Sequence, residues 1–114
     1  MNIAFLDAKT LGEDVDFSLL EKYGELIIHP LTAVADIVPR AIDADILIVN
    51  KVVLDKAVLT QLPKLKLICE AATGTDNIDI EFAKSKGISV NNVVGYSTDS
   101  VVQHTLSLIH ISEP

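Results

Sequence analysis

The chain has few of the residues that carry the commonest kinds of site. Its 114 residues include no tryptophan, and aromatic residues make up only 4% of it, although 49% is hydrophobic. The core must therefore be built from Ile, Leu, Val and Ala, which is typical of parallel sheets buried on both faces. The single cysteine, Cys69, cannot form an internal disulfide, and its place in an apolar run indicates a buried structural thiol.

Several catalytic and ligand-binding motifs are also missing. The three histidines, His29, His104 and His110, lack the spacing of metal ligands, and neither HExxH nor CxxC occurs. The five glycines form neither GxGxxG nor a P-loop, and no serine or cysteine lies in a nucleophile elbow. These 114 residues therefore contain no recognisable metal, dinucleotide or nucleophile motif.

Basic residues are scarce relative to acidic ones, and the net charge is -7. This excess argues against binding to nucleic acid or to an anionic membrane, although solubility alone also explains it. No window approaches the roughly 18 consecutive apolar residues of a membrane span, and no signal peptide is recognisable. The default expectation is a soluble, cytoplasmic protein.

Short apolar runs recur at intervals of about twenty residues. Each is too short for a helix and rich in Ile, Leu and Val, which favours buried strands. Segments with helical punctuation separate them, so strands alternate with helices. The sequence therefore predicts an α/β fold with a doubly wound, parallel, five-stranded sheet. The predicted strands are residues 3–6, 26–28, 46–49, 65–69 and 88–90.

Start and stop signals place the helices between these strands. Thr32 could cap a helix, but Pro39 must distort or break it. Gly87 is a good residue to follow the end of another helix. The predicted helices are residues 17–23, 33–42, 54–62 and 78–86, with a last one beginning at Ser97 or Thr98.

Polar and small residues collect directly after the predicted strands. Because the carboxyl ends of parallel strands meet at one edge of a sheet, this edge is the expected ligand site. Gly74 would let backbone N–H groups approach a small anion closely, and Lys51 could add a positive charge. The residues concerned are Asp7, Asn50, Lys51, 73–77, Asn91, Asn92, Gly95 and Tyr96.

Simpler roles remain open for most of these residues. Gly74 could be an ordinary turn glycine and Lys51 a solvated surface lysine, while Tyr96 suits a ligand contact or an interface equally. His29, which follows the second predicted strand, more simply ends a loop, and His104 packs or faces solvent within a helix. Three side chains could cap the helix predicted from residue 78: Asp76, Asn77 and Asp79.

Two stretches of the sequence together resemble the D-isomer-specific 2-hydroxyacid dehydrogenases. The first reads Ala71-Ala-Thr-Gly-Thr-Asp-Asn-Ile-Asp79. The second reads Gly87-Ile-Ser-Val-Asn-Asn-Val-Val-Gly-Tyr-Ser-Thr-Asp-Ser-Val-Val-Gln-His-Thr-Leu106. Their spacing also fits, and the resemblance extends over residues 1 to about 109. The Asn50-Lys51 pair is most similar to the glycerate dehydrogenase (hydroxypyruvate reductase) branch.

The resemblance implies a two-domain enzyme that uses NAD to interconvert D-2-hydroxy acids and 2-keto acids. Residues 1–96 would form its flavodoxin-like substrate-binding domain, and 97–114 the start of an inter-domain helix. That helix would lead to an NAD-binding domain bearing GxGxxG. The implied substrate-binding residues are Asn50, Lys51, Thr73, Gly74, Thr75 and Tyr96, and Val101 would lie near the nicotinamide.

The resemblance also implies that much of the enzyme lies elsewhere. The family's catalytic Arg, Glu and His fall beyond residue 114, and none of the histidines here matches that His. Residues 110–114 depart from the family's apolar continuation and look foreign. We therefore expect this chain alone to be inactive and not to bind NAD, and we expect a homodimer only for the full-length parent. A helix from the parent's far C-terminus would also be missing, which should expose apolar area.

Two other classes of protein compete with this interpretation. A signalling receiver domain shares the sheet order, but it needs an acidic pair, an Asp and a Lys where this chain has Asp7, Asn50 and Asn91. A non-catalytic module that binds small anions is the second rival, and the sequence does not separate it from an enzyme's substrate domain.

Overall fold

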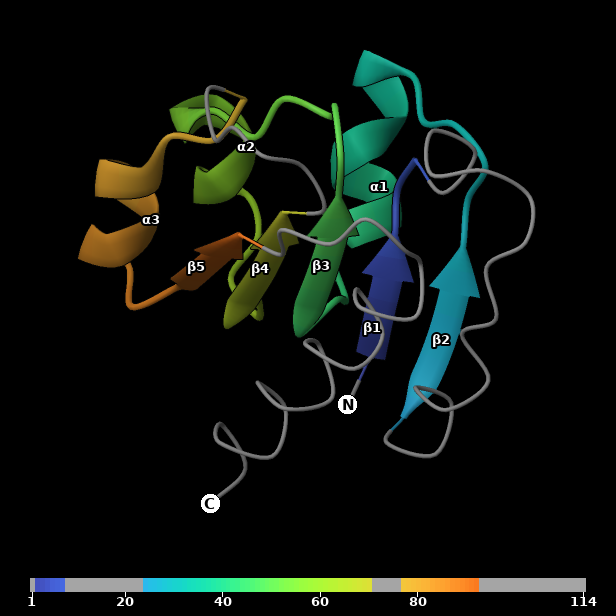
Figure 1. The fold of residues 1–114 in the computed structure, drawn as a ribbon, viewed down its shortest axis with the longest axis horizontal. Helices are drawn as coiled ribbons and strands as arrows, with labels where there is room; N and C mark the ends of the chain where they lie inside the picture. Colours follow the sequence, from blue (N-terminus) through green and yellow to red (C-terminus); the bar gives the residue numbers. More distant parts are fainter. Residues whose placement is uncertain (1, 8–23, 71–76, 93–114) are drawn as a thin grey trace.

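The computed structural model describes residues 2–7, 24–70 and 77–92. Within them, parallel strands form one sheet in the order β2-β1-β3-β4-β5 (Figure 1). This is the flavodoxin-like order, so the predicted fold class is confirmed. The strands are β1 (Asn2–Phe5), β2 (Glu25–Ile28), β3 (Ile46–Val49), β4 (Leu67–Glu70) and β5 (Ser89–Asn92).

Each strand begins and ends within about two residues of the predicted apolar run. β4 extends one residue beyond its predicted run and so ends on an acid, Glu70. All four residues of β3 and of β4 are buried, as expected of central strands covered on both faces. β2 lies at one edge of the sheet and is largely exposed. Glu70, the last residue of β4, is buried together with the apolar residues before it.

Three short helices cover one face of the sheet (Figure 1). They are α1 (Ile37–Ala41), α2 (Lys56–Thr60) and α3 (Ile80–Ser85). Their buried residues pack with Leu47, Ile68 and other strand residues of that face into one aliphatic cluster. The predicted helices 17–23 and 97 onward, and the proposed domain boundary at residue 96, lie outside the described residues.

Local signals set both ends of α3 as the sequence predicts. The Asp79 carboxylate accepts a hydrogen bond from the Phe82 N–H at 3.1 Å, so the capping interpretation of Asp79 is confirmed. Gly87 has a φ of 81°, the left-handed conformation that ends many helices. The Ile88 and Gly87 N–H groups then bond to the carbonyls of Ala83 and Lys84, which completes a Schellman motif.

Replacing Asp79 with alanine should therefore lower the free energy of unfolding by about 1 kcal/mol, because the Phe82 N–H loses its acceptor. Asp36 offers a matched control, since it precedes α1 in the same position but its side chain caps nothing. Asp36→Ala should change stability by less than about 0.5 kcal/mol. Urea unfolding of both variants makes the comparison, and equal losses would contradict the cap.

The helix before β3 differs from the prediction at two residues. Thr32 does not cap it; the Thr32 hydroxyl instead donates to the Leu6 carbonyl at 2.7 Å, joining this segment to the end of β1. A 3-10 turn, Val34–Asp36, precedes α1. Pro39 does not break α1, because it lies in the first turn, where a helix does not use its N–H groups.

Candidate functional site

The carboxyl ends of all five strands point to the same edge of the sheet (Figure 1). At this edge Asp7, which follows β1, reaches across to the end of β3. Its carboxylate accepts backbone hydrogen bonds from Asn50 at 2.9 Å, Lys51 at 2.6 Å and Val52 at 3.2 Å. Asp7 is only 3% exposed, and three N–H donors compensate a buried carboxylate for the water it loses. Asp7 thus holds the backbone in place where β3 ends.

A second connection fixes the chain between β3 and α3. The Asn77 amide donates to the carbonyls of Val52 at 2.8 Å and Asn50 at 3.4 Å. Nearby, the Leu54 N–H donates to the Asn77 carbonyl, and the Asp79 N–H donates to the Leu54 carbonyl. The alternative that Asn77 caps α3 is therefore wrong, because its side chain bonds to the segment after β3 and Asp79 is the cap.

The structure places two of the predicted substrate residues together at this edge. Asn50 is half-buried and Lys51 is exposed, and both lie at the end of β3, held through their backbone N–H groups by Asp7. An exposed Lys51 agrees with both its predicted role and the solvated alternative. Four further predicted residues lie outside the described part of the chain: Thr73, Gly74, Thr75 and Tyr96. So do Asp76, His104 and Val101, the predicted nicotinamide neighbour.

Glu70 is the residue at this edge that sequence reasoning missed. It is fully buried, and neither carboxyl oxygen has a hydrogen-bond partner among the described residues. Burial is the main cause that raises the pKa of Glu70 to about 7; the nearby Asn77 amide opposes this rise in part, and the Asp7 charge adds a smaller contribution to it. The signal available in the sequence was an acid that ends an apolar run.

Other potentially reactive groups do not gather here. His29 follows β2, where its backbone N–H bonds to Phe5, and burial and the Arg40 charge lower its pKa. Cys69 is buried in β4, as predicted. In the described part of the chain, no three His, Cys, Asp or Glu side chains could hold a metal ion. Nor does any described helix have the length and apolar character to cross a membrane.

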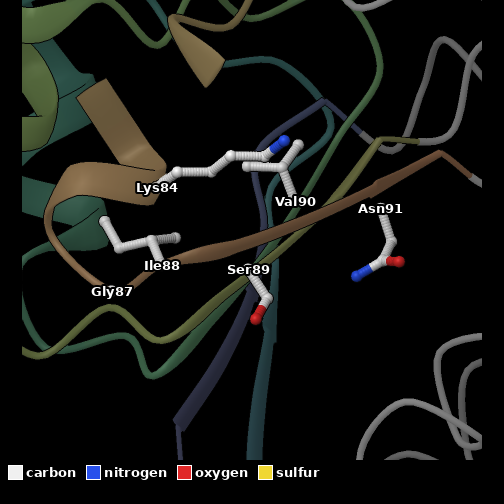
Figure 2. A pocket seen from close by; sticks show the side chains of 6 residues that line it. All are labelled: Lys84, Gly87, Ile88, Ser89, Val90 and Asn91. Carbon is white, nitrogen blue, oxygen red and sulfur yellow. The ribbon is translucent and has the colours of Figure 1, made fainter. Parts of the chain in front are cut away.

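A hollow lies along the outer side of β5. Figure 2 shows Lys84 and Val90 projecting to one side of the strand, and Ser89 and Asn91 to the other. Asn91 is the one predicted edge residue that lines it. The hollow is shallow and lacks converging polar groups, so it does not serve as a second small-molecule site. It is lined by Lys84, Gly87, Ile88, Ser89, Val90 and Asn91.

The sheet order defines a flavodoxin-like α/β domain, a class of fold in which ligands bind at the carboxyl ends of the strands. The family model for the D-isomer specific 2-hydroxyacid dehydrogenase catalytic domain matches residues 3–107. The chain belongs to this family.

Relatives with known names agree with that assignment. The chain is 35% identical to a hydroxypyruvate reductase of Blautia hydrogenotrophica, over 96% of this chain and 35% of the relative. It is 38% identical to a glycerate dehydrogenase of Methylorubrum extorquens, over 94% of this chain and 34% of the relative. The chain thus spans about a third of the length of these relatives.

A solved structure confirms the fold independently. NAD+-bound 3-phosphoglycerate dehydrogenase of Entamoeba histolytica superposes with a TM-score of 0.71 at 31% identity. The match covers 82% of this chain and 32% of that one. The architecture seen in the described residues is therefore that of one part of a larger dehydrogenase.

Proposed function

We propose that this chain is the substrate side of an NAD-dependent oxidoreductase that interconverts D-2-hydroxy acids and 2-keto acids, with glycerate and hydroxypyruvate as the favoured pair. The family match over residues 3–107 carries the proposal. The names of the relatives support the pair of substrates. A cytoplasmic location and a homodimer formed through the parent's second domain belong to the same proposal.

The polar edge supports a role in binding the substrate's carboxylate. Asn50 and Lys51 are held at the end of β3, and Glu70 and Asn77 are fixed on either side of residues 71–76. Within that segment we assign Thr73, Gly74 and Thr75 as backbone donors to the carboxylate, because a glycine permits close approach of N–H groups. Tyr96 would complete the substrate contacts.

The described residues do not fit the cofactor itself. A dinucleotide site needs a glycine-rich turn after its first strand, so that backbone N–H groups can meet the pyrophosphate. Here β1 is followed by Leu6 and by the buried carboxylate of Asp7, which would repel a phosphate. We therefore assign NAD to a second domain of the parent, with Val101 near the nicotinamide and the catalytic Arg, Glu and His beyond residue 114.

Activity assays test this division of labour. The 114-residue chain should show no turnover with NADH and hydroxypyruvate, whereas a complete enzyme that contains this domain should reduce hydroxypyruvate. Turnover by the short chain would show that its own residues supply the catalytic groups. An inactive complete enzyme that still binds hydroxypyruvate would favour the small-anion module.

Substitution of Gly74 tests the carboxylate site. In the complete enzyme, Gly74→Val should raise KM for hydroxypyruvate by about tenfold or more, a loss of roughly 1.4 kcal/mol of binding, because a side chain would keep the N–H donors away from the anion. Val53→Ala is the control, since Val53 is an exposed residue near the same edge and should leave KM unchanged. Unchanged kinetics in Gly74→Val would remove Gly74 from the site.

A further inference from the structure

The outer side of β2 is a strand edge to which no other described strand is paired. β2 pairs with β1 on its inner side, and it is the outermost described strand of the sheet (Figure 1). The His29 N–H donates to the Phe5 carbonyl at 2.8 Å, so positions 25, 27 and 29 turn their backbone groups towards β1. Backbone groups alternate in direction along a strand, and Leu26 and Ile28 therefore turn theirs outwards. Their two N–H and two carbonyl groups are the groups that a further strand would bond.

Exposed apolar side chains are concentrated at this edge. Six large hydrophobic residues are exposed in the described part of the chain, and four of them lie in β2 or shortly after it: Ile27, Ile28, Leu31 and Val34. A cluster of this kind marks an interaction site more often than scattered apolar residues do. β2 itself contains no lysine or arginine, the residues that most often keep an edge strand from pairing. We therefore expect this edge to be covered in solution.

The charges along the edge differ in sign between its two ends. The exposed Glu25 begins β2, and His29 follows its last residue. Burial and, after it, the charge of nearby Arg40 lower the pKa of His29, so a guanidinium lies close to this imidazole. Arg40 also borders a small hollow over β2 that Glu25 and Ile27 line, which places these side chains on one face of the sheet. An acidic start and a basic end match those of a second β2 strand that runs in the opposite direction.

An antiparallel pairing of two β2 strands also satisfies the backbone. When Ile27 lies opposite Ile27 of a second copy, Leu26 lies opposite Ile28 of that copy. The outward N–H and carbonyl groups then face each other in hydrogen-bonded pairs on either side of the central isoleucines. Pro30, the next outward position, has no N–H, so the ladder ends there. The register that centres on Ile27 therefore uses every outward backbone group of β2.

The same register places opposite charges together. Glu25 lies opposite His29 of the second copy, and directly opposite residues of an antiparallel pair share a face of the sheet. The Glu25 carboxylate therefore approaches both the imidazole and the neighbouring Arg40 of the second copy. Because the two copies use the same residues, this contact occurs twice, once on each side of the axis.

We propose that two copies of this chain associate through β2, antiparallel about a two-fold axis at Ile27, so that their five-stranded sheets join into one continuous sheet. Each strand contributes four residues, so the contact is small and its dissociation constant should be on the order of micromolar. It differs from the homodimer proposed for the parent's second domain, and it does not depend on catalytic activity.

Sedimentation equilibrium of the 114-residue chain measures the association. The average mass should rise from 12.3 kDa towards twice that value as the concentration increases. Glu25→Lys should raise the dissociation constant by at least about tenfold, because the new ammonium group faces His29 and Arg40 of the second copy. Glu81→Lys is the matched control: it makes the same change of charge at an exposed glutamate in α3 and should alter the dissociation constant by less than about twofold.

Cysteine substitution tests the register. Opposite residues of a non-hydrogen-bonded antiparallel pair have Cα atoms about 4.5 Å apart, a separation that a disulfide can span. Ile27→Cys should therefore give a disulfide-linked dimer under mild oxidation. Ile28→Cys is similarly exposed but should not, because position 28 lies opposite Leu26 of the second copy. The native Cys69 is buried and should not contribute.

Three results would overturn this inference. The first is a chain that stays monomeric well above micromolar concentration. The second is a dimer whose dissociation constant Glu25→Lys leaves unchanged, since association would then use another surface, such as the opposite edge strand β5. The third is equal cross-linking of Ile27→Cys and Ile28→Cys, which would exclude the register centred on Ile27. None of these results bears on hydroxypyruvate reduction, so the proposed function is tested separately.

Discussion

Replacing Asp7 with alanine is expected to destabilise the chain by about 3–5 kcal/mol, which is a large effect for a single substitution. The Asp7 carboxylate holds the N–H groups of Asn50, Lys51 and Val52, and the substitution leaves these donors without their acceptor in a part-buried setting. Small domains are stable by only about 5–15 kcal/mol, so the loss is a large share of the total. Urea unfolding measures it.

Two comparisons identify the cause of that loss. Asp7→Asn keeps the size of the side chain but turns one acceptor oxygen into a donor facing N–H groups, so it should destabilise almost as much as alanine. Asp43→Ala removes an exposed carboxylate that contacts Lys64 at 3.3 Å, and it should cost no more than about 1 kcal/mol. If Asp43→Ala and Asp7→Ala proved equal, the three backbone bonds would not be the source of stability.

The second large effect concerns the pH dependence of stability. Glu70 has a pKa of about 7 in the folded chain and an ordinary value of 4.5, so the folded state holds its proton more tightly. Its contribution is therefore most favourable below pH 4.5 and is lost as the pH rises to about 7, a decrease of about 3 kcal/mol. Other carboxylates that are hydrogen-bonded in the folded state change stability in the opposite direction, so the useful quantity is a difference between variants.

Glu70→Gln isolates that contribution. The stability of the unmodified chain relative to Glu70→Gln should fall between pH 4.5 and 7 and stay constant above about pH 8, as followed by urea unfolding at a series of pH values. Glu81→Gln, at an exposed site in α3, should show no such trend. A constant difference between Glu70→Gln and the unmodified chain would mean that Glu70 ionises as readily in the folded as in the unfolded state.

The elements of this fold that the sequence predicted are those determined by neighbouring residues. Apolar runs bounded by polar residues located the strands, and the ends of α3 followed from Asp79 and Gly87. Because parallel strands share a direction, the run of polar residues after each strand also located the edge that holds Asn50 and Lys51. Each of these inferences needed only a few consecutive residues.

The features that escaped prediction depend on residues far apart in the chain. Asp7 bonds to backbone groups 43 to 45 residues away, and Asn77 bonds to a carbonyl 25 residues away. Likewise, Thr32 was predicted to cap the helix that follows it, but its hydroxyl donates to the carbonyl of Leu6, 26 residues earlier. Glu70 was missed for the same reason, since its burial depends on the strands on either side. No local pattern distinguishes such side chains from ordinary turn residues.

The exposed apolar residues of the edge strand β2 have a practical consequence for handling this polypeptide. Ile27 and Ile28 are 48% and 44% exposed, and they lie on opposite faces of a strand at the edge of the sheet. An apolar edge strand is a template on which strands of other molecules can align, and charged residues are the usual protection against it. Lysine at position 27 would supply that protection far from Asp7 and Glu70, so it is the first change to make if concentrated samples precipitate.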